Sequence, residues 1–379
     1  MILVGGCDHD SKKKVIHMPQ QNINNKKENL DIKKVFDFTK TLFASILRSR
    51  KGALVELARL SRFQKGTKGY ERQYERLLPL IQELKIAFWD SVKENLPKYG
   101  LCLGIFDDSS IKKTGKLFPK QQVHHDHCSG SFYTGLKVFS SLIYQAGKTA
   151  TIQSEIVGKE DNKLDVAKQH FDKLISYFAV DVFLFDSWYC KHPLISYIQE
   201  KKKNFISRIR CDSTVLGMEE KRIDKIVKHT SHKEYEHIKI HGKSYWIKEF
   251  SFKFKTYGEL RVIASKEGQF DEPIFLVTNA SNFSAKFVVQ LYLRRFSIEI
   301  FFKDAKQYLN FETFFCRSSQ KWELHLSLIN ILHWIIQRRY SISRVVRSMR
   351  ENFEMCLLFI NKNPLLLKFF EGVTKTCQI

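Results

Sequence analysis

The stretch YLRRFSIEIFFKDAK, residues 292–306, contains no Pro or Gly and predicts a helix. Four of its residues, Tyr292, Arg295, Glu299 and Lys306, stand at offsets of 0, 3, 7 and 14. At about 100° per residue, these offsets place the four side chains on one face, within roughly 60° of each other. The stretch therefore predicts a helix with Tyr, Arg, Glu and Lys in a stripe along one side.

Most of the remaining circumference of this helix is apolar, which predicts that the helix is largely buried. The apolar residues are Phe296, Ile298, Ile300, Phe301 and Phe302. Charged groups on a buried helix need partners, because an unpaired buried charge is costly. At this point the stripe has two open interpretations, an internal ladder of ion pairs or a functional site.

In the spacing Tyr-x2-Arg-x3-Glu-x6-Lys, the chain resembles the DDE transposases of bacterial insertion sequences, in the insertion sequence 4 group. All four positions match without a gap. The resemblance implies that Glu299 is the third of three catalytic carboxylates, and that Tyr292, Arg295 and Lys306 hold DNA near the cut. It also implies two Asp residues upstream, at the ends of strands.

Two apolar segments upstream end in acids. YGLCLGIFDDSS carries Asp107 and Asp108, and DVFLFDSWYC carries Asp186. In α/β proteins, the carboxyl end of a buried strand faces the crevice where such sheets bind ligands. The alternative for Asp186 is the N-cap of a helix. In the related enzymes the catalytic Asp directly precedes a small hydroxyl residue, which favours Asp108, before Ser109, and leaves Asp107 as the alternative.

Asp108, Asp186 and Glu299 predict a metal site. Three carboxylates in one crevice repel each other unless cations neutralise them, and oxygen ligands favour Mg²⁺ or Mn²⁺ over Zn²⁺. Two Mg²⁺ ions, for which Mn²⁺ can substitute, can activate the attacking oxygen and stabilise the leaving oxygen of an in-line phosphoryl transfer. The family resemblance implies the same roles for the three acids.

Basic residues near these acids predict contacts with DNA phosphates, because guanidinium and ammonium groups suit phosphate oxygens. Lys113 follows the first acids in the turn KKTGK, and Arg208 and Arg210 end the predicted strand NFISRIR. A solvated basic turn is the alternative for Lys113. The same alternative, a solvated position without a DNA contact, applies to Arg208 and Arg210.

The order of predicted elements indicates an α/β chain with a ribonuclease-H-like catalytic core, which opens as strand, turn, strand, strand. We predict a basic, helical, DNA-binding domain with a disordered start over residues 1–98. The catalytic domain follows over 99–340 and contains a β-rich insertion at about 212–271. A helical tail covers 341–379. The alternative for the core is any mixed sheet with acids at a strand end.

The composition narrows the choice of partner. The formal net charge of the 379-residue chain is +23, which points to a polyanion, either nucleic acid or an anionic membrane. No apolar run reaches about 18 residues, so a membrane-spanning helix is not predicted. The eight Cys are scattered without a Cys-x2-Cys pair, which favours reduced thiols in the cytoplasm over disulfides or a zinc finger.

The prediction for function is a cut-and-paste transposase. It would bind the terminal inverted repeats of its own element, hydrolyse the phosphodiester at each end, and join the freed 3′-hydroxyls to target DNA. The resemblance implies a prokaryotic, nucleoid-associated homodimer in a synaptic complex, and a DNA hairpin intermediate in many relatives. Two alternatives stay open, a metal-independent tyrosine recombinase with Tyr292 as nucleophile and an inactive copy kept as a DNA-binding repressor.

The β-rich segment at about 212–271 predicts a role in handling the DNA hairpin, because the insertion sequence 4 group carries a β-strand insertion at this place. The segment contains Trp246 and Tyr257, whose rings could stack on an extruded base. The alternative is a packing role, in which the inserted strands only cover one face of the core.

Overall fold

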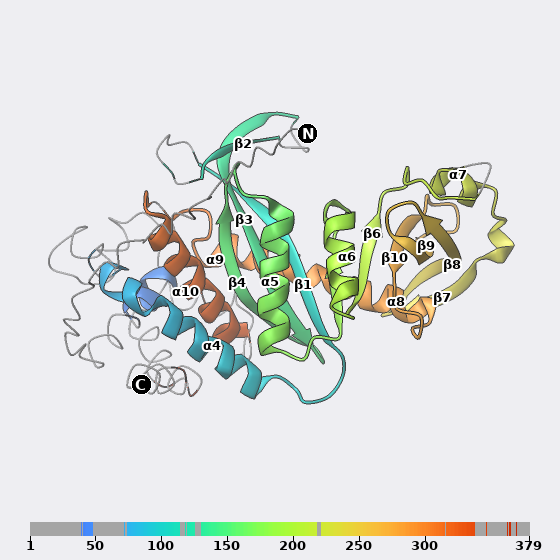
Figure 1. The fold of residues 1–379 in the computed structure, drawn as a ribbon. Helices are drawn as coiled ribbons and strands as arrows, with labels where there is room; N and C mark the ends of the chain where they lie inside the picture. Colours follow the sequence, from blue (N-terminus) through green and yellow to red (C-terminus); the bar gives the residue numbers. More distant parts are fainter. Residues whose placement is uncertain are drawn as a thin grey trace, which may run out of the picture.

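The computed structural model describes residues 41–47, 74–113, 120–125, 130–217, 221–314 and 316–337, and a few single positions besides (39, 72, 118, 346, 362, 364 and 369). Most of the predicted N-terminal domain and nearly all of the predicted C-terminal tail lie outside these residues. The α/β class predicted from the sequence is confirmed by the large mixed sheet with helices beside it (Figure 1).

The strands of the described residues form one sheet in the order β2-β3-β1-β5-β6-β10-β9-β8-β7. β4 lies outside this order and pairs with residues 137–145 of β3, while β2 pairs with residues 132–135. β1 pairs antiparallel with β3 and parallel with β5, and β5 pairs parallel with β6. The strands are β1 (Cys102–Lys112), β2 (Gln122–His125), β3 (Phe132–Gln145), β4 (Lys148–Val157), β5 (Val182–Phe185), β6 (Asn204–Ile209), β7 (Glu236–Ile240), β8 (Lys243–Phe254), β9 (Gly258–Lys266) and β10 (Ile274–Thr278).

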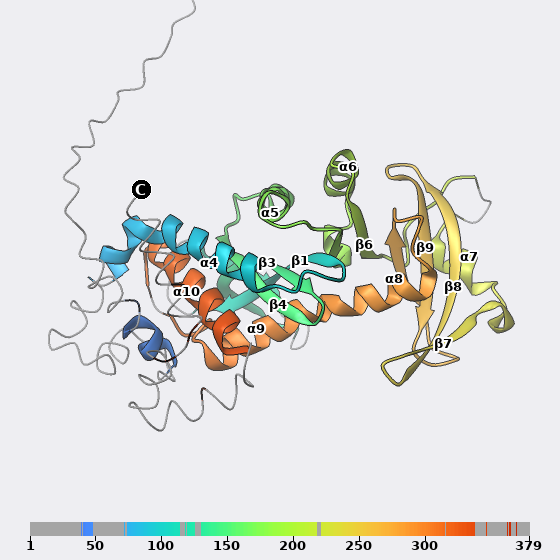
Figure 2. The ribbon, with the colours of Figure 1, turned by 90° about the horizontal axis from the view of Figure 1, so that it is seen from below.

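Helices cover both faces of the first half of this sheet. α5 and α6 lie on one side of it and α9 on the other, while α4 and α10 pack beside β4 (Figure 2). The helices are α4 (Ile81–Asn95), α5 (Lys163–Tyr177), α6 (His192–Glu200), α7 (Ile223–Lys228), α8 (Ala285–Tyr292), α9 (Phe296–Tyr308) and α10 (Ser319–Gln337). Short 3₁₀ turns are η1 (Leu78–Leu80), η2 (Ser187–Tyr189), η3 (His232–Glu234) and η4 (Leu293–Arg295).

The β-rich segment continues the sheet of the core. β7, β8 and β9 are antiparallel neighbours, and β9 pairs with β10, which returns to pair with β6. The turn between β7 and β8 is made by His241 and Gly242, with φ of 50° and 81°. Two successive residues with positive φ suit a tight hairpin, and Gly adopts that conformation without strain.

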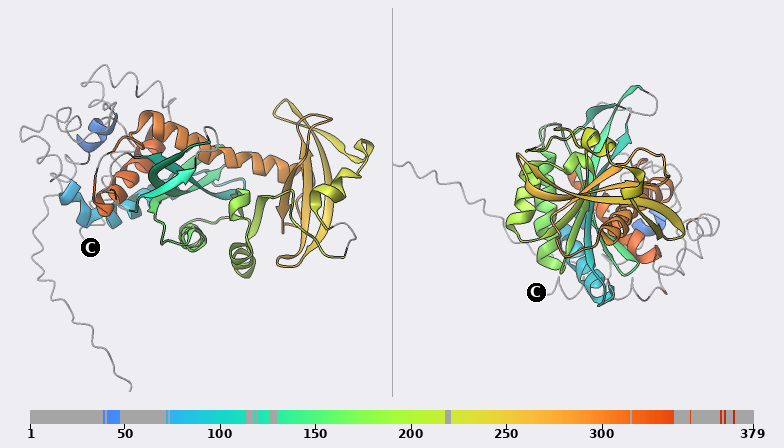
Figure 3. Two further views of the ribbon diagram at one scale, coloured as in Figure 1. Left: turned by 90° about the horizontal axis from the view of Figure 1, so that it is seen from above. Right: turned by 90° about the vertical axis from the view of Figure 1, so that its right-hand side faces the viewer.

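The signature stretch runs as α8, η4 and α9 in one nearly straight rod from the β-rich half to the core (Figure 3). Ile298, Phe301 and Phe302 are buried as the sequence predicts. The prediction of burial is wrong for Phe296 and Ile300, which are 47% and 57% exposed. The rod runs from the β-rich segment to the core, and other elements do not cover all of its sides along the way. Phe296 and Ile300 lie on an uncovered side.

Within the described residues, no helix combines the length and the apolar character that crossing a membrane requires. α10 comes nearest in length, and its apolar side chains are buried against β4 and α4.

Candidate active site on one face of β1 and β5

The strand register brings Asp107, Asp186 and Arg208 into one row. β1 and β5 run in parallel with Ile105 opposite Leu184. Continuing this register by two residues places Asp107 opposite Asp186. β5 and β6 are parallel with Phe185 opposite Ser207, so the next residues, Asp186 and Arg208, are also opposite. Residues opposite each other in neighbouring strands point to the same face of a sheet.

That face carries α9. Ser140 pairs with Asp107 in the sheet, and its hydroxyl lies 2.8 Å from that of Ser154, which donates to Asn330 of α10. Asp107 itself accepts a hydrogen bond of 3.0 Å from Arg295, at the start of α9. The two predicted acids that face α9 are therefore Asp107 and Asp186. Asp186 directly follows β5 as predicted, but β1 continues to Lys112, so the prediction that Asp107 and Asp108 end their strand is wrong and both lie in the middle of β1.

Asp108 lies on the other face of β1. Side chains alternate along a strand, and Asp108 accepts hydrogen bonds from Lys163 at the start of α5 and from Tyr189. Lys137 of β3 adds an ion pair of 2.9 Å. Asp108, which the sequence favours as the first catalytic acid, is thus kept apart from Glu299, and the alternative, Asp107, is beside it.

Arg295 joins the first acid to the signature Glu. One guanidinium nitrogen donates to Asp107 and the other to Glu299. Arg295 is only 8% exposed, and its Nε is buried without a hydrogen-bond partner in the described part of the chain. Arg295 therefore acts in this structure as the cation of the carboxylate site.

The environment of Asp107 disfavours a bare negative charge. Burial raises the pKa of this carboxyl to about 7, against the lowering effect of Arg295, and the neighbouring Asp108 and Asp186 raise it further. As the described residues stand, no three His, Cys, Asp or Glu side chains are grouped closely enough to hold a metal ion. Arg295 lies between Asp107 and Glu299.

The other two signature residues flank the acids. Tyr292 is 5% exposed, and its pKa is raised to about 12, chiefly by burial. The guanidinium of Arg295 lies 5.7 Å from the centre of its ring. Lys306 is half-buried, donates to the carbonyl oxygen of Ser110 at 3.0 Å and pairs with Glu312. Its ammonium therefore lies beside the end of β1, on the α9 side.

Of the three other predicted DNA contacts, two are exposed. Arg208 is exposed on β6, in the row with the acids. It lies close enough to Tyr292 for its positive charge to lower the pKa of that tyrosine, against the larger effect of burial. Arg210 is exposed farther along and forms a two-pronged ion pair with Asp212, at 2.9 and 2.7 Å.

The prediction for Lys113 is corrected, because its side chain is 2% exposed. Its ammonium donates to the carbonyl oxygens of Glu312 and Phe314, at 2.5 and 2.8 Å, and lies 5.1 Å from the ring centre of Trp322. Burial lowers the pKa of this amine to about 8. The loop before α10 uses Lys113 as an internal cap, so its ammonium does not face DNA.

Replacement of Lys113 by Met is expected to destabilise the fold and to leave the strength of DNA contacts per folded molecule unchanged. Each carbonyl left without a donor costs about 1–3 kcal/mol. Thermal unfolding measures the loss, and the salt dependence of DNA binding is the control. A variant of normal stability that binds DNA more weakly would restore Lys113 as a DNA contact.

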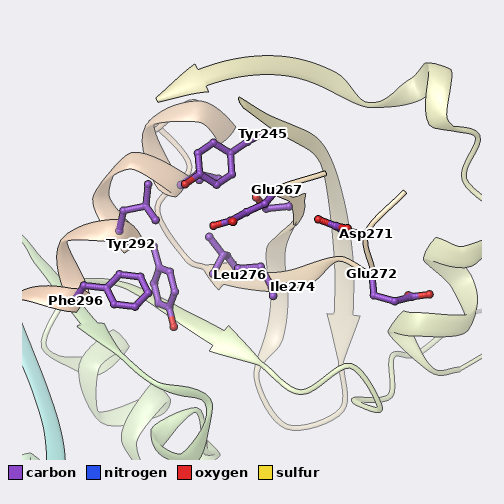
Figure 4. Close-up of a pocket in the computed structure, with 11 residues that line it drawn as sticks. Tyr245, Glu267, Asp271, Glu272, Ile274, Leu276, Tyr292 and Phe296 are labelled. Atoms are coloured by element: carbon purple, nitrogen blue, oxygen red, sulfur yellow. The ribbon is translucent and has the colours of Figure 1, made fainter. Parts of the chain in front are cut away.

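A cavity of about 210 Å³ opens between the β-rich half and the rod. Of the site residues only Tyr292 lines it, and three other carboxylates, those of Glu267, Asp271 and Glu272, lie around it. Figure 4 shows Tyr292 and Phe296 side by side on the rod, with Tyr245 from β8 across from them and Glu267 pointing into the space. The aromatic residues named from the sequence do not line this cavity. Trp246 packs on His237 at 4.9 Å, and Tyr257 donates to the carbonyl oxygen of Cys190.

Sequence reasoning missed part of this arrangement. Tyr245 is next to Trp246, and only the packing of α8 against β8 shows which of the two faces the rod. Lys163 and Tyr189 give no sequence signal for their contact with Asp108, because they are 55 and 81 positions away from it. Asp107 gives no sequence signal that separates it from Asp108, because its match to Asp186 follows only from the register of β1 with β5.

Comparison with known proteins bears on the whole described core. The model of a protein family described as "Transposase DDE domain" matches residues 98–335, which is more than half of the chain. No curated protein matches the sequence. The crystal structure of the NurA nuclease from Sulfolobus solfataricus aligns over 61% of this chain and 85% of that chain, with 11% identity and a TM-score of 0.26. Overlap this low has no bearing on the fold or the function of the chain.

Proposed function

The chain belongs to the transposase DDE domain family, and we propose that it cuts and rejoins DNA as the cut-and-paste transposase of an insertion sequence. Binding of DNA follows from the family. The observation that carries the finer proposal is the bridge from Asp107 through Arg295 to Glu299, with Asp186 opposite Asp107 in the strand register.

The strand order supports a ribonuclease-H-like core. Taken alone, the first five strands of that core read β4-β3-β1-β5-β6, with β3 antiparallel to β1 and with β1, β5 and β6 parallel. A helix follows each of β4 and β5, and the β-rich insertion follows β6. In this arrangement the carboxyl end of β5 lies beside the middle of β1, where Asp107 and Asp186 are in register and can act together.

Members of this family generally use divalent metal ions, and the donor set here fits such ions. All three acids offer oxygen ligands, which suit Mg²⁺ or Mn²⁺. The buried Asp107, with its pKa raised to about 7 by burial and by its acidic neighbours, gains most from a cation. We propose that Asp107, Asp186 and Glu299 hold two Mg²⁺ ions, for which Mn²⁺ can substitute. When bound, the ions would activate the attacking oxygen and stabilise the leaving oxygen.

Arg295 has two roles in this proposal. Without metal it neutralises Asp107 and Glu299, at 10% side-chain exposure. If cations neutralised those acids, the guanidinium would no longer be needed to balance their charge, and it could bind a phosphate beside the cut. Its planar fork matches phosphate oxygens as it does carboxylate oxygens.

The remaining residues position DNA. Arg208 and Lys306 flank the acids on β6 and α9 and would contact phosphates on either side of the cut, with Arg210 as an outer contact. Tyr292 would pack against the terminal strand. We further propose that the aromatic cavity formed by Tyr245, Tyr292 and Phe296 receives a base extruded when a hairpin forms at the cut end.

Two copies of the chain would act together, one at each end of the element, in a synaptic complex at the bacterial nucleoid. This part of the proposal rests on the resemblance in the signature spacing. Size measurement of the chain with and without DNA that carries both terminal repeats tests it directly.

The tyrosine recombinase is disfavoured. A nucleophilic Tyr must reach the phosphate and lose its proton, and Tyr292 is 5% exposed with its pKa raised to about 12. An inactive DNA-binding repressor would not need Asp107 and Glu299 to be joined through Arg295. The deciding experiment incubates the chain with its gene's flanking DNA and Mg²⁺. Cleavage that EDTA abolishes supports the transposase. EDTA-resistant cleavage supports the recombinase, and binding without cleavage supports the repressor.

DNA binding by the chain is expected to weaken steeply as salt rises, because each neutralised phosphate releases counterions, with a log–log slope of about −0.9 per contact. Replacement of Arg208 or Lys306 by Ala is expected to reduce the magnitude of that slope by about one. Fluorescence anisotropy with a labelled duplex measures it.

The matched control is Lys168→Ala, since Lys168 lies on α5, at the opposite face of the sheet. Its slope is expected to equal that of the wild type. Equal slopes for Arg208→Ala, Lys306→Ala and the wild type would remove both residues from the DNA surface.

A further inference from the structure

The face of β1 opposite the catalytic acids carries a second, closed cluster around Asp108. Its carboxylate accepts hydrogen bonds from Lys163 and from the hydroxyl of Tyr189, and pairs with Lys137 at 2.9 Å. The Asp108 side chain is 12% exposed. Every oxygen of this carboxylate is therefore used in holding its neighbours.

Tyr189 connects this cluster to the backbone of Asp186, whose side chain belongs to the other face of the sheet. It is fully buried, and its ring lies 5.7 Å from that of Phe106 and 5.6 Å from that of Phe139. It belongs to η2, the 3₁₀ turn directly after Asp186, and its backbone N–H donates to the carbonyl oxygen of Asp186 at 3.0 Å. The hydroxyl of Ser207 approaches the same carbonyl at 3.4 Å.

Asp108 is thus connected to the backbone of Asp186 in two ways. The pairing of β1 with β5 joins their strands, and Tyr189 donates its hydroxyl to Asp108 and its backbone N–H to the carbonyl oxygen of Asp186. A shift of η2 would move the Asp186 carboxylate relative to Asp107, in the neighbouring strand. Carboxylates that share a cation must be held to a fraction of an ångström, and residues behind the ligands commonly do this.

We propose that Asp108 is a positioning residue, which acts through Tyr189 to fix the turn after Asp186 and so sets the distance between Asp186 and Asp107. The proposal rests on the proposed function, because it takes Asp107 and Asp186 as the metal ligands. It explains why two adjacent acids stand in the middle of β1, one facing each side of the sheet.

The charges of the cluster agree with this role. Burial by itself raises the pKa of Asp108, but Lys163 and Lys137 hold it below its ordinary value. The two ammonium groups favour the carboxylate form that accepts from Tyr189. Lys163 also lies 3.6 Å from the centre of the Trp188 ring, and Lys191 lies 4.0 Å from it. These contacts fix the exposed residue of η2 as well as its buried one.

The test is the affinity of the full-length chain for Mn²⁺, measured from the paramagnetic resonance signal of the free ion, without DNA. Replacement of Tyr189 by Phe removes only the hydroxyl and is expected to weaken Mn²⁺ binding about 10–100-fold, as loss of a group behind metal ligands commonly does. Asp108→Asn, which keeps the size of the side chain, is expected to weaken binding to a similar degree.

The control is Tyr197→Phe. Tyr197 donates to Asp172 at 2.7 and 2.8 Å, between α6 and α5, so it loses a tyrosine–carboxylate bond in the same helical layer. Its Mn²⁺ affinity is expected to equal that of the wild type. Thermal unfolding of each variant separates a change in metal affinity from a change in the folded fraction.

The outcomes separate this proposal from the proposed function. Wild-type affinity in folded Tyr189→Phe overturns the positioning role and leaves the metal site standing. Complete loss of binding in Asp108→Asn with normal binding in Tyr189→Phe and Asp107→Asn makes Asp108 a ligand and also overturns it. Absence of Mn²⁺ binding by the wild type overturns the metal site itself, and the positioning role with it.

Discussion

Asp107→Asn, Asp186→Asn and Glu299→Gln are each expected to lower the rate of DNA strand cleavage by about a thousand-fold or more, while DNA binding stays near that of the wild type. A metal ion stabilises the transition state by several kcal/mol, and each 1.4 kcal/mol is a factor of ten in rate. The effect falls on cleavage because the ligands act on the reacting phosphate in the transition state, and much less on the bound duplex.

The matched control for the first acid is Asp108→Asn. The two residues are adjacent and chemically identical, and they differ in the face of β1 that they occupy. With saturating Mn²⁺, Asp108→Asn is expected to lower the cleavage rate far less than Asp107→Asn does, because Asp108 acts on the metal ligands only through Tyr189. Normal cleavage by Glu299→Gln would remove the signature helix from the active site. Normal cleavage by Asp107→Asn with none by Asp108→Asn would exchange the roles of the two acids.

The second large effect is expected at the aromatic cavity. Replacement of Phe296 or Tyr245 by Ala should leave the first nick unaffected and slow the double-strand break about 10–100-fold. Stacking of a base on an aromatic ring is worth about 1–3 kcal/mol, and only the step that extrudes a base uses it. A gel that resolves nicked, hairpin and fully cut DNA measures each product, and nicked DNA should accumulate.

Trp246→Ala is the control for the cavity. Trp246 follows Tyr245 on β8, and its ring packs on His237 and His232, at 4.9 and 6.1 Å, and does not line the cavity. It should give normal amounts of all three products. Normal double-strand cutting by a folded Phe296→Ala and a folded Tyr245→Ala would mean that the β-rich segment only covers the core.

These point variants are sharper than removal of the whole β-rich segment. β9 of that segment is hydrogen-bonded to β10, and α8 packs against β8 and β9. Deletion would therefore expose an edge of the sheet and one side of the rod that carries the signature residues. The point variants keep that support.

The sequence by itself determined the elements that depend on local patterns. The spacing of Tyr292, Arg295, Glu299 and Lys306 gave a helix and its functional face, because helical geometry fixes which residues share a side. The strand before Asp186 and the hairpin at His241 and Gly242 follow from apolar runs and turn residues. The family was also visible at this level, in four residues at fixed spacings.

Only the tertiary structure decided between neighbours in a strand. Asp107 and Asp108, like Tyr245 and Trp246, are chemically suited to the same task, and one step along a strand reverses the face. For Asp107 and Asp108 the face is set by the pairing of β1 with β5, which is distant in the sequence. For Tyr245 and Trp246 it is set by the packing of α8 against β8, which is also distant in the sequence. No local pattern contains that pairing or that packing.

Which individual side chains are buried was likewise decided by the tertiary structure. Lys113 in KKTGK looks like a solvated residue, and it became an internal cap because the loop before α10 brings two carbonyl oxygens to its ammonium. Phe296 and Ile300 look like core residues, and they are exposed because the rod bridges the two halves of the molecule. Apolar periodicity predicts which face of a helix can be buried, and the arrangement of the other elements determines where it is.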